Sequence, residues 1–188
     1  MIPKRMQQLD RDARGLPIPA TVWRDQTGQP HFTINDTAIS GRLLIEDRCG
    51  ICGSELLRVR WFVGGPLSAL HPRGAYNDLP MHRGCMHYAL RVCPYLAAPS
   101  YARRIDARTV REPERNRTFI DPSMDDKRPV VFVAVAATGQ RVAAQPNLLP
   151  RIFPMRPYVA VEYWRHGKRI SEPEAKQLIV EAYSKRKE

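Results

Sequence analysis

Hydrophobic residues gather in four stretches whose pattern predicts β-strands. Residues 20–34 predict a β-hairpin, because two apolar, β-branched and aromatic runs flank the turn sequence Thr27-Gly28-Gln29. Residues 129–137 are continuously apolar and rich in valine, which predicts a strand buried on both faces. Similar but shorter patterns predict strands within 56–63 and 158–164.

Two further stretches carry the spacing and the boundary residues of helices. Residues 82–92 predict a helix that Pro94 ends, because proline cannot donate the next backbone hydrogen bond. The sequence Ser171-Glu172-Pro173-Glu174 is a capping box with proline in the first turn, and it predicts a helix over 172–183. One face of that helix would carry its apolar residues, Ala175, Leu178, Ile179 and Ala182. Strands and helices alternate without an internal repeat, so the predicted fold class is α+β.

The composition changes along the chain and divides it into four segments. Residues 1–19 are charged and contain alternating prolines, which predicts an extended arm. Residues 20–104 would form the hairpin and a cysteine-containing module, and 105–128 a charged loop. Residues 129–188 would supply strands and the last helix, packed as one compact unit with 20–104. Within them, the proline-punctuated stretch 145–157 predicts a loop.

The overall composition is that of a folded domain. The chain has 188 residues, of which 43% are hydrophobic and 26% charged, so it can bury a core and is not disordered throughout. No apolar run approaches the roughly 18 residues of a membrane helix. The polar first residues contain no apolar core of a secretory signal. We therefore expect a cytoplasmic protein with no membrane partner.

The net charge is strongly positive and favours an anionic partner. Thirty Lys and Arg residues stand against nineteen Asp and Glu, which gives +11. Residues 127–170 hold eight basic residues and one acid, Glu162. The candidate nucleic-acid contacts are Arg103, Arg104, Arg151, Arg156, Arg165, Lys168 and Arg169. Stacking on bases is a possible role for Tyr158, Tyr163 and Trp164, although aromatic residues in strands more often pack in the core. A solvated basic surface without a partner is the alternative.

Three cysteines and one histidine have the spacing of a zinc site. Cys49 and Cys52 form one Cys-x2-Cys pair, and His82 and Cys85 form a second pair at the start of the predicted helix. Residues three apart on a helix lie on the same face, so both can reach one ion. A turn with two cysteines, a hairpin and a helix that begins with two ligands predict a treble-clef zinc finger. Four protein ligands leave no position for water, so the Zn²⁺ would be structural.

Neighbouring candidates fit the same ion less well. Cys93 lies about 12 Å further along the helix than Cys85 and is predicted to be a core thiol. His87 faces away from Cys85 and is predicted to be exposed or hydrogen-bonded. A pair of structural thiols and a redox-active Cys-x-x-Cys site are the alternatives to zinc, and the redox site lacks its usual βαβ context.

The cysteine-containing block resembles a family of small, uncharacterised zinc-binding proteins of bacteria and their phages. The similarity lies in Cys49-Gly50-Ile51-Cys52-Gly53, Phe62-Val63-Gly64-Gly65-Pro66, Pro80-Met81-His82-Arg83-Gly84-Cys85 and Tyr88-Ala89-Leu90-Arg91-Val92-Cys93-Pro94-Tyr95-Leu96. The resemblance implies zinc binding and a phage or prophage origin, hence a location in the host cytoplasm. It implies no activity.

Three functions are compatible with these observations. The first is a non-enzymatic, zinc-stabilised protein that binds nucleic acid, DNA or RNA, through an arginine-rich surface. The second is a protein-binding inhibitor or modulator that docks on an acidic host protein. The third is a nuclease of the His–Asn–His type built from His71, Asn77 and His87, but the histidine pair at a strand end that this chemistry needs is absent.

Overall fold

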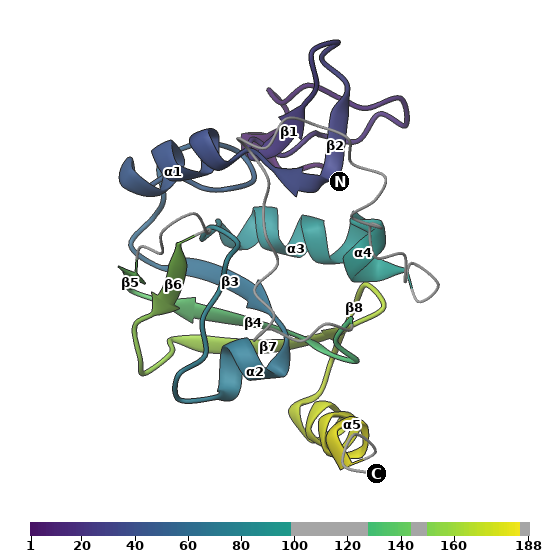
Figure 1. Ribbon diagram of the computed structural model, residues 1–188. Coiled ribbons are helices and arrows are strands. Elements are labelled where there is room, and N and C mark those ends of the chain that lie inside the picture. Colours follow the sequence, from purple (N-terminus) through teal and green to yellow (C-terminus); the bar gives the residue numbers. More distant parts are fainter. Residues whose placement is uncertain (99–127, 144–149, 185–188) are drawn as a thin grey trace.

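The centre of the protein is a four-stranded antiparallel sheet (Figure 1). The computed structural model describes residues 1–98, 128–143 and 150–184. The sheet has the order β3 (Arg60–Gly64), β4 (Phe132–Ala137), β7 (Ala160–Arg165) and β8 (Lys168–Ile170). The predicted α+β class is confirmed.

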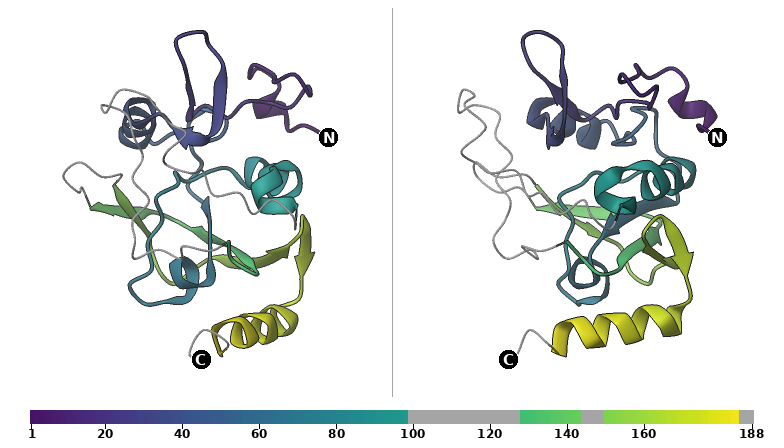
Figure 2. Two further views of the ribbon diagram at one scale, coloured as in Figure 1. Left: turned by 45° about the vertical axis from the view of Figure 1, so that its right-hand side comes forward. Right: turned by 90° about the vertical axis from the view of Figure 1, so that its right-hand side faces the viewer.

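Strand β4 is buried along its whole length, as predicted, because helices cover both faces of the sheet. Helix α3 (Arg83–Val92) lies on one face, whereas α2 (Pro66–Leu70) and α5 (Glu172–Ser184) lie on the other (Figures 1 and 2). Side chains of β4 alternate between two cores, since successive residues of a strand point to opposite faces. The core under α3 contains Phe132, Ala134 and Ala136, and the other core contains Val133, Val135 and Ala137.

Both long predicted helices are present. Helix α3 begins after His82 and ends at Val92, and Pro94 then opens a second short helix, α4 (Pro94–Ala97). In α5 the backbone N–H of Glu174 donates to Ser171 Oγ at 3.4 Å, which is half of the predicted capping box. The buried face of α5 is the predicted one: Ala175 is fully buried, and Leu178 and Ile179 pack against the second core.

The predicted hairpin is formed by β1 (Val22–Arg24) and β2 (Pro30–Asn35). The helix that follows it, α1 (Thr37–Ile45), is capped by Asp36, whose Oδ1 accepts the Ile39 N–H at 2.9 Å. A further small sheet pairs β5 (Gln140–Ala143) with β6 (Arg151–Pro154).

Strand β6 corrects the prediction of a loop over 145–157. Ile152 is fully buried and exchanges two backbone hydrogen bonds of 2.8 Å with Tyr76. The prolines that suggested a loop stand at or beyond the ends of the strand, and a short two-stranded ribbon tolerates them there. The predicted loop 105–128 lies outside the described residues except for Arg128.

The first nineteen residues do not form an extended arm. They include a short 3-10 helix (Lys4–Met6) and a bridge between Arg11 and Pro17. Met6 is buried in the core under α3, with Ile2 and Leu9 packed against it. Burial of these three apolar side chains holds the charged first segment against the rest of the domain.

We expect Met6→Ala to lower the free energy of unfolding by about 2–5 kcal/mol, because it leaves a cavity in the main core. Urea denaturation of the protein measures this value. Arg5→Ala, an exposed neighbour in the same turn, is the control and should change it by less than about 0.5 kcal/mol. Equal stability of the two variants would contradict the packing of this segment.

Candidate metal centre

The fold brings the four predicted ligands together in one buried cluster. The ligand atoms of Cys49, Cys52, His82 and Cys85 all lie within 4.8 Å of one another, and all four residues are buried. Within the described part of the chain, no other group of histidine, cysteine and acidic side chains is arranged to hold a metal ion.

The backbone of the first cysteine pair is a tight turn that needs glycine. The N–H of Gly53 donates to the carbonyl of Cys49 at 2.8 Å, and Gly53 has a φ of 69°, a conformation that glycine adopts without strain. The N–H of Gly50 donates to the Pro80 carbonyl at 3.0 Å. A Cβ on Gly50 would lie 2.7 Å from the Cβ of Leu79, so the two ligand pairs approach closely only with glycine at this position.

The second ligand pair is positioned by a single antiparallel bridge. Trp61 in β3 and Met81 exchange two N–H···O bonds of 2.9 Å, and His82 follows at once as the N-cap of α3. This bridge is all that the structure has of the predicted hairpin between the ligand pairs. The long partner of β3 is β4, which pairs with five of its residues. The structure therefore has the Cys/His cluster without confirming a treble clef.

The imidazole of His82 is held in the tautomer that a metal ligand needs. Its Nε2 lies 2.9 Å from the backbone carbonyl oxygen of Glu55. A carbonyl only accepts hydrogen bonds, so Nε2 carries the proton, and the lone pair of Nδ1 faces the thiols, 3.4 Å from Cys52 Sγ. Such a partner on the second nitrogen is usual for metal-binding histidines.

The thiols are too crowded to ionise independently. Hydrogen bonds from Cys52 and Cys85 lower the pKa of Cys49, whereas the presence of Cys49 raises the pKa of Cys52 and of Cys85. A divalent cation among the three sulfurs would favour their thiolate forms. Three sulfurs and one imidazole nitrogen are a donor set that suits Zn²⁺. The four residues would hold the ion, and its chemistry would be structural, because they fill a tetrahedral coordination shell.

Other cysteine and histidine residues lie apart from this cluster. Cys93 is the half-buried N-cap of α4. His87 is hydrogen-bonded, which is one of its two predicted states. Of the residues considered for a nuclease, His71 lies at the end of α2, where its Nδ1 accepts the backbone N–H of Arg73 at 3.1 Å.

A buried carboxylate on the sheet, Glu162, is the main feature that sequence reasoning missed. Its Oε2 lies 2.8 Å from His87 Nε2 and accepts the Trp164 indole N–H at 3.2 Å, while Oε1 accepts from Arg83 at 3.2 Å. Burial alone would raise the pKa of Glu162, but the hydrogen bonds from His87 and Arg83 hold it below its ordinary value. The only sequence signal was a single acid among basic and apolar residues, because its partners come from distant segments.

The predicted nucleic-acid contacts have different environments. Arg156 is structural: its guanidinium donates to the carbonyls of Ala69 and His71 at 3.1 and 2.7 Å, at the end of α2. Arg165 is half-buried, and its Nε is buried without a hydrogen-bond partner among the described residues. Arg151, in β6, is half-buried, whereas Lys168 and Arg169, both in β8, are exposed, as is Arg156. Arg103 and Arg104 lie outside the described residues.

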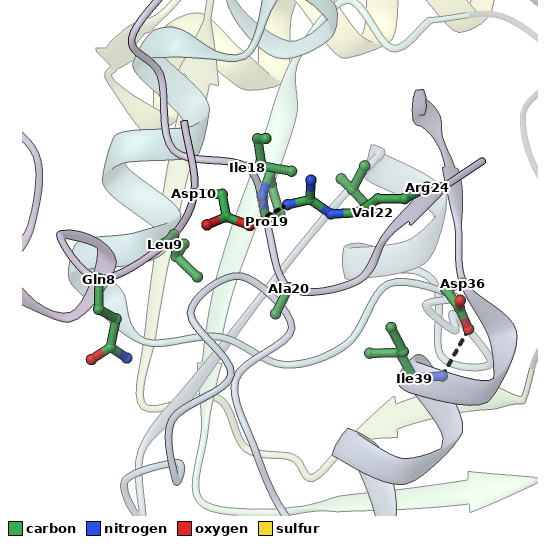
Figure 3. A pocket seen from close by; sticks show the side chains of 10 residues that line it. All are labelled: Gln8, Leu9, Asp10, Ile18, Pro19, Ala20, Val22, Arg24, Asp36 and Ile39. Atoms are coloured by element: carbon green, nitrogen blue, oxygen red, sulfur yellow. Dashed lines mark hydrogen bonds and ion pairs between the residues drawn. The ribbon is translucent and has the colours of Figure 1, made fainter. Parts of the chain in front are cut away.

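An open cavity of about 320 Å³ lies between the first residues and the β1–β2 hairpin (Figure 3). Arg24 and Asp10 form a 2.9 Å ion pair at its edge, which also borders a neighbouring cavity of about 480 Å³. The lining contains no cysteine or histidine, so it adds no metal ligand.

Comparison of the chain with protein families, with curated proteins and with solved structures gives no match. In the part of the chain that the structure describes, the helices are too short or too polar to cross a bilayer. The site must therefore be interpreted from its own geometry.

We expect Cys52→Ser and Cys85→Ser to abolish stoichiometric zinc binding and to lower the melting temperature by more than 10 °C, since each removes one of four ligands. Metal analysis of the purified protein and thermal unfolding measure the two effects. Cys93→Ser is the matched control and should keep the wild-type zinc content. Full zinc occupancy in either of the first two variants would contradict the site.

Glu162→Gln should lower the free energy of unfolding by about 2–4 kcal/mol, because one of the two buried oxygens that accept from Arg83, His87 and Trp164 becomes an amide nitrogen, which cannot accept. Chemical denaturation at neutral pH provides the comparison. Glu172→Gln breaks only an exposed ion pair with Lys176, at 2.8 Å, and should cost less than about 0.5 kcal/mol. A similar loss in both variants would refute the special role of Glu162.

Proposed function

We propose that this is a zinc-stabilised, non-enzymatic protein that binds nucleic acid through one basic face. This basic face consists of the exposed residues Arg83 and Arg91 of α3 with Lys168 and Arg169 of β8. The zinc would hold the start of α3 against the Cys49–Cys52 turn and would thereby position the face.

The observation that carries the proposal is the convergence of Arg83, from the helix, and Arg169, from the hairpin, on Glu162. Arg83 and Arg169 approach the same carboxylate oxygen, at 3.2 and 4.0 Å. The turn of the β7–β8 hairpin lies against the C-terminal end of α3, since a Cβ on Gly167 would be 3.5 Å from the carbonyl oxygen of Arg91. Helix and hairpin therefore form one continuous surface.

The charge of this surface remains positive in spite of Glu162. The carboxylate is 3% exposed and already paired, so it repels an approaching anion much less than an exposed one would. The side chains of Arg83 and Arg169 are about 60% exposed, at 61% and 59%. Arginines presented in this way attract phosphates, and their counterions are released on binding.

We also propose that the metal ligands lie in a reduced treble clef, in which a single bridge takes the place of the hairpin. The basis is the cysteine turn, the bridge and the helix that surround the ligands. The resemblance in the cysteine block leads us to propose a phage or prophage origin and a role in the host cytoplasm. Neither proposal is needed for the basic face to bind nucleic acid.

A protein partner is the second candidate function. Several large apolar side chains are exposed around the end of the sheet where β3 begins and β4 ends, including Ile45 at 87%, Leu57 at 57% and Val159 at 57%. Apolar side chains exposed together are typical of protein contacts. An acidic host protein could use this end of the molecule and the basic face together.

We expect Lys168→Ala combined with Arg169→Ala to weaken binding to duplex DNA and to make the salt dependence shallower by about two charges. Fluorescence anisotropy across a salt series measures both. The control is Arg156→Ala, which removes a positive charge that is bound to α2 carbonyls. It should reduce stability and leave the salt slope unchanged. Unchanged binding by the double variant would remove β8 from the interface.

A further inference from the structure

The large aromatic rings beneath the basic face are covered by its arginines. Trp61 and Trp164 are only 5% and 3% exposed. The guanidinium of Arg83 lies over the Trp61 ring at 5.7 Å, and that of Arg91 over the Trp164 ring at 5.6 Å. The His87 ring fills the space between them, with ring centroids 6.4 Å from Trp61 and 5.3 Å from Trp164.

The two tryptophans therefore offer no stacking platform for unpaired bases. Proteins that hold single strands stack successive bases on exposed aromatic rings. Tyr95 in α4 is 44% exposed, and its ring packs against Phe132 with the ring centroids 5.9 Å apart. His166, in the turn between β7 and β8, is the exposed ring next to Lys168. Tyr163, predicted as a possible stacking residue, belongs to the core on the opposite side of the sheet.

The same contacts preorganise the arginines for phosphate. A guanidinium held over an indole ring has fewer conformations open to it, so it loses less side-chain freedom when it binds. Arg83 uses one nitrogen for Glu162, and its other donors are available to solvent because the side chain is largely exposed. Arg91 has the ring of Trp164 as its described contact and is also exposed.

The separation of the two arginines is fixed by the helix that carries them. Arg83 and Arg91 are eight positions apart in α3, which places their Cα atoms about 12 Å apart along the helix axis. The major groove of B-form DNA is about 12 Å wide, with a row of phosphates along each edge. Two rigid cations at a fixed spacing suit a ligand whose phosphates are also held at a fixed spacing.

We propose that the basic face binds the sugar–phosphate backbone of double-stranded nucleic acid in preference to single strands, with Arg83 and Arg91 as phosphate-binding residues. This inference rests on the proposed function and specifies its ligand. Recognition is by charge and spacing, so the sequence of the duplex matters little.

The test compares two probes of equal length with the full, zinc-loaded chain. A labelled duplex of about 24 base pairs and a labelled oligo-dT of about 24 nucleotides are titrated by fluorescence anisotropy from 50 to about 200 mM salt. Unlabelled duplex RNA competes against the DNA duplex. We expect at least about tenfold tighter binding of the duplex near physiological salt.

The variants test the two arginines separately from total charge. Arg91→Gln alone, and Arg83→Gln with Arg91→Gln, should weaken duplex binding about tenfold or more and reduce the salt slope by about one charge per arginine. Arg91→Lys keeps the charge but loses the planar, multi-donor guanidinium, and should weaken binding about threefold. Arg42→Gln with Arg73→Gln removes two exposed arginines elsewhere and should leave the duplex preference intact. Zinc content and melting temperature are measured for each variant.

The results distinguish a failure of the duplex preference from a failure of nucleic-acid binding itself. A duplex preference that is lost with Arg91→Gln in a zinc-loaded, folded variant supports the inference. Equal or tighter binding of oligo-dT overturns the inference and leaves nucleic-acid binding in place. A duplex preference unaffected by either glutamine variant overturns the assignment to α3. Failure of every probe to bind near physiological salt overturns the proposed function itself.

Discussion

The packing of α3 against the face of the sheet formed by β3 and β4 is the interaction on which the rest of the structure depends. Met86 and Leu90 of the helix share one core with Trp61 of β3 and with Phe132, Ala134 and Ala136 of β4. Because the helix sits close to the sheet, each of its sides has a defined neighbour. Its first turn meets the cysteine turn, and the side next to β7 meets Glu162. The metal cluster, the main core and the basic face thus all depend on the position of this one helix.

The features that sequence predicted correctly are those set by neighbouring residues. The Cys-x2-Cys and His-x2-Cys spacings identified the ligands, and the valine-rich run identified β4, because each pattern is complete within a few positions. The partner of β3 could not be deduced in this way. Its predicted hairpin strand is one bridge at Met81, and its real partner lies about seventy residues further along the chain.

The net charge of the sequence predicted a positive surface, but it did not identify which basic side chains are available to a ligand. Arg156 and Arg165 belong to the most basic segment, yet the first is bound to α2 carbonyls and the second is half-buried. Nothing in the sequence distinguishes Arg83 and Arg91, because a cation on the polar side of a helix is ordinary. Their proposed role depends on Trp61 and Trp164, which only the folded sheet brings beneath them.

The hydrogen bond between His82 and residue 55 has an evolutionary consequence. The acceptor is the main-chain carbonyl, and the side chain of Glu55 is exposed. Almost any amino acid at position 55 would supply the same oxygen, so related sequences can vary there freely while retaining the histidine. Insertions or deletions between Cys52 and Trp61 would displace that oxygen. Selection on this hydrogen bond would therefore act on the length of the loop and leave the side chain at position 55 free to change.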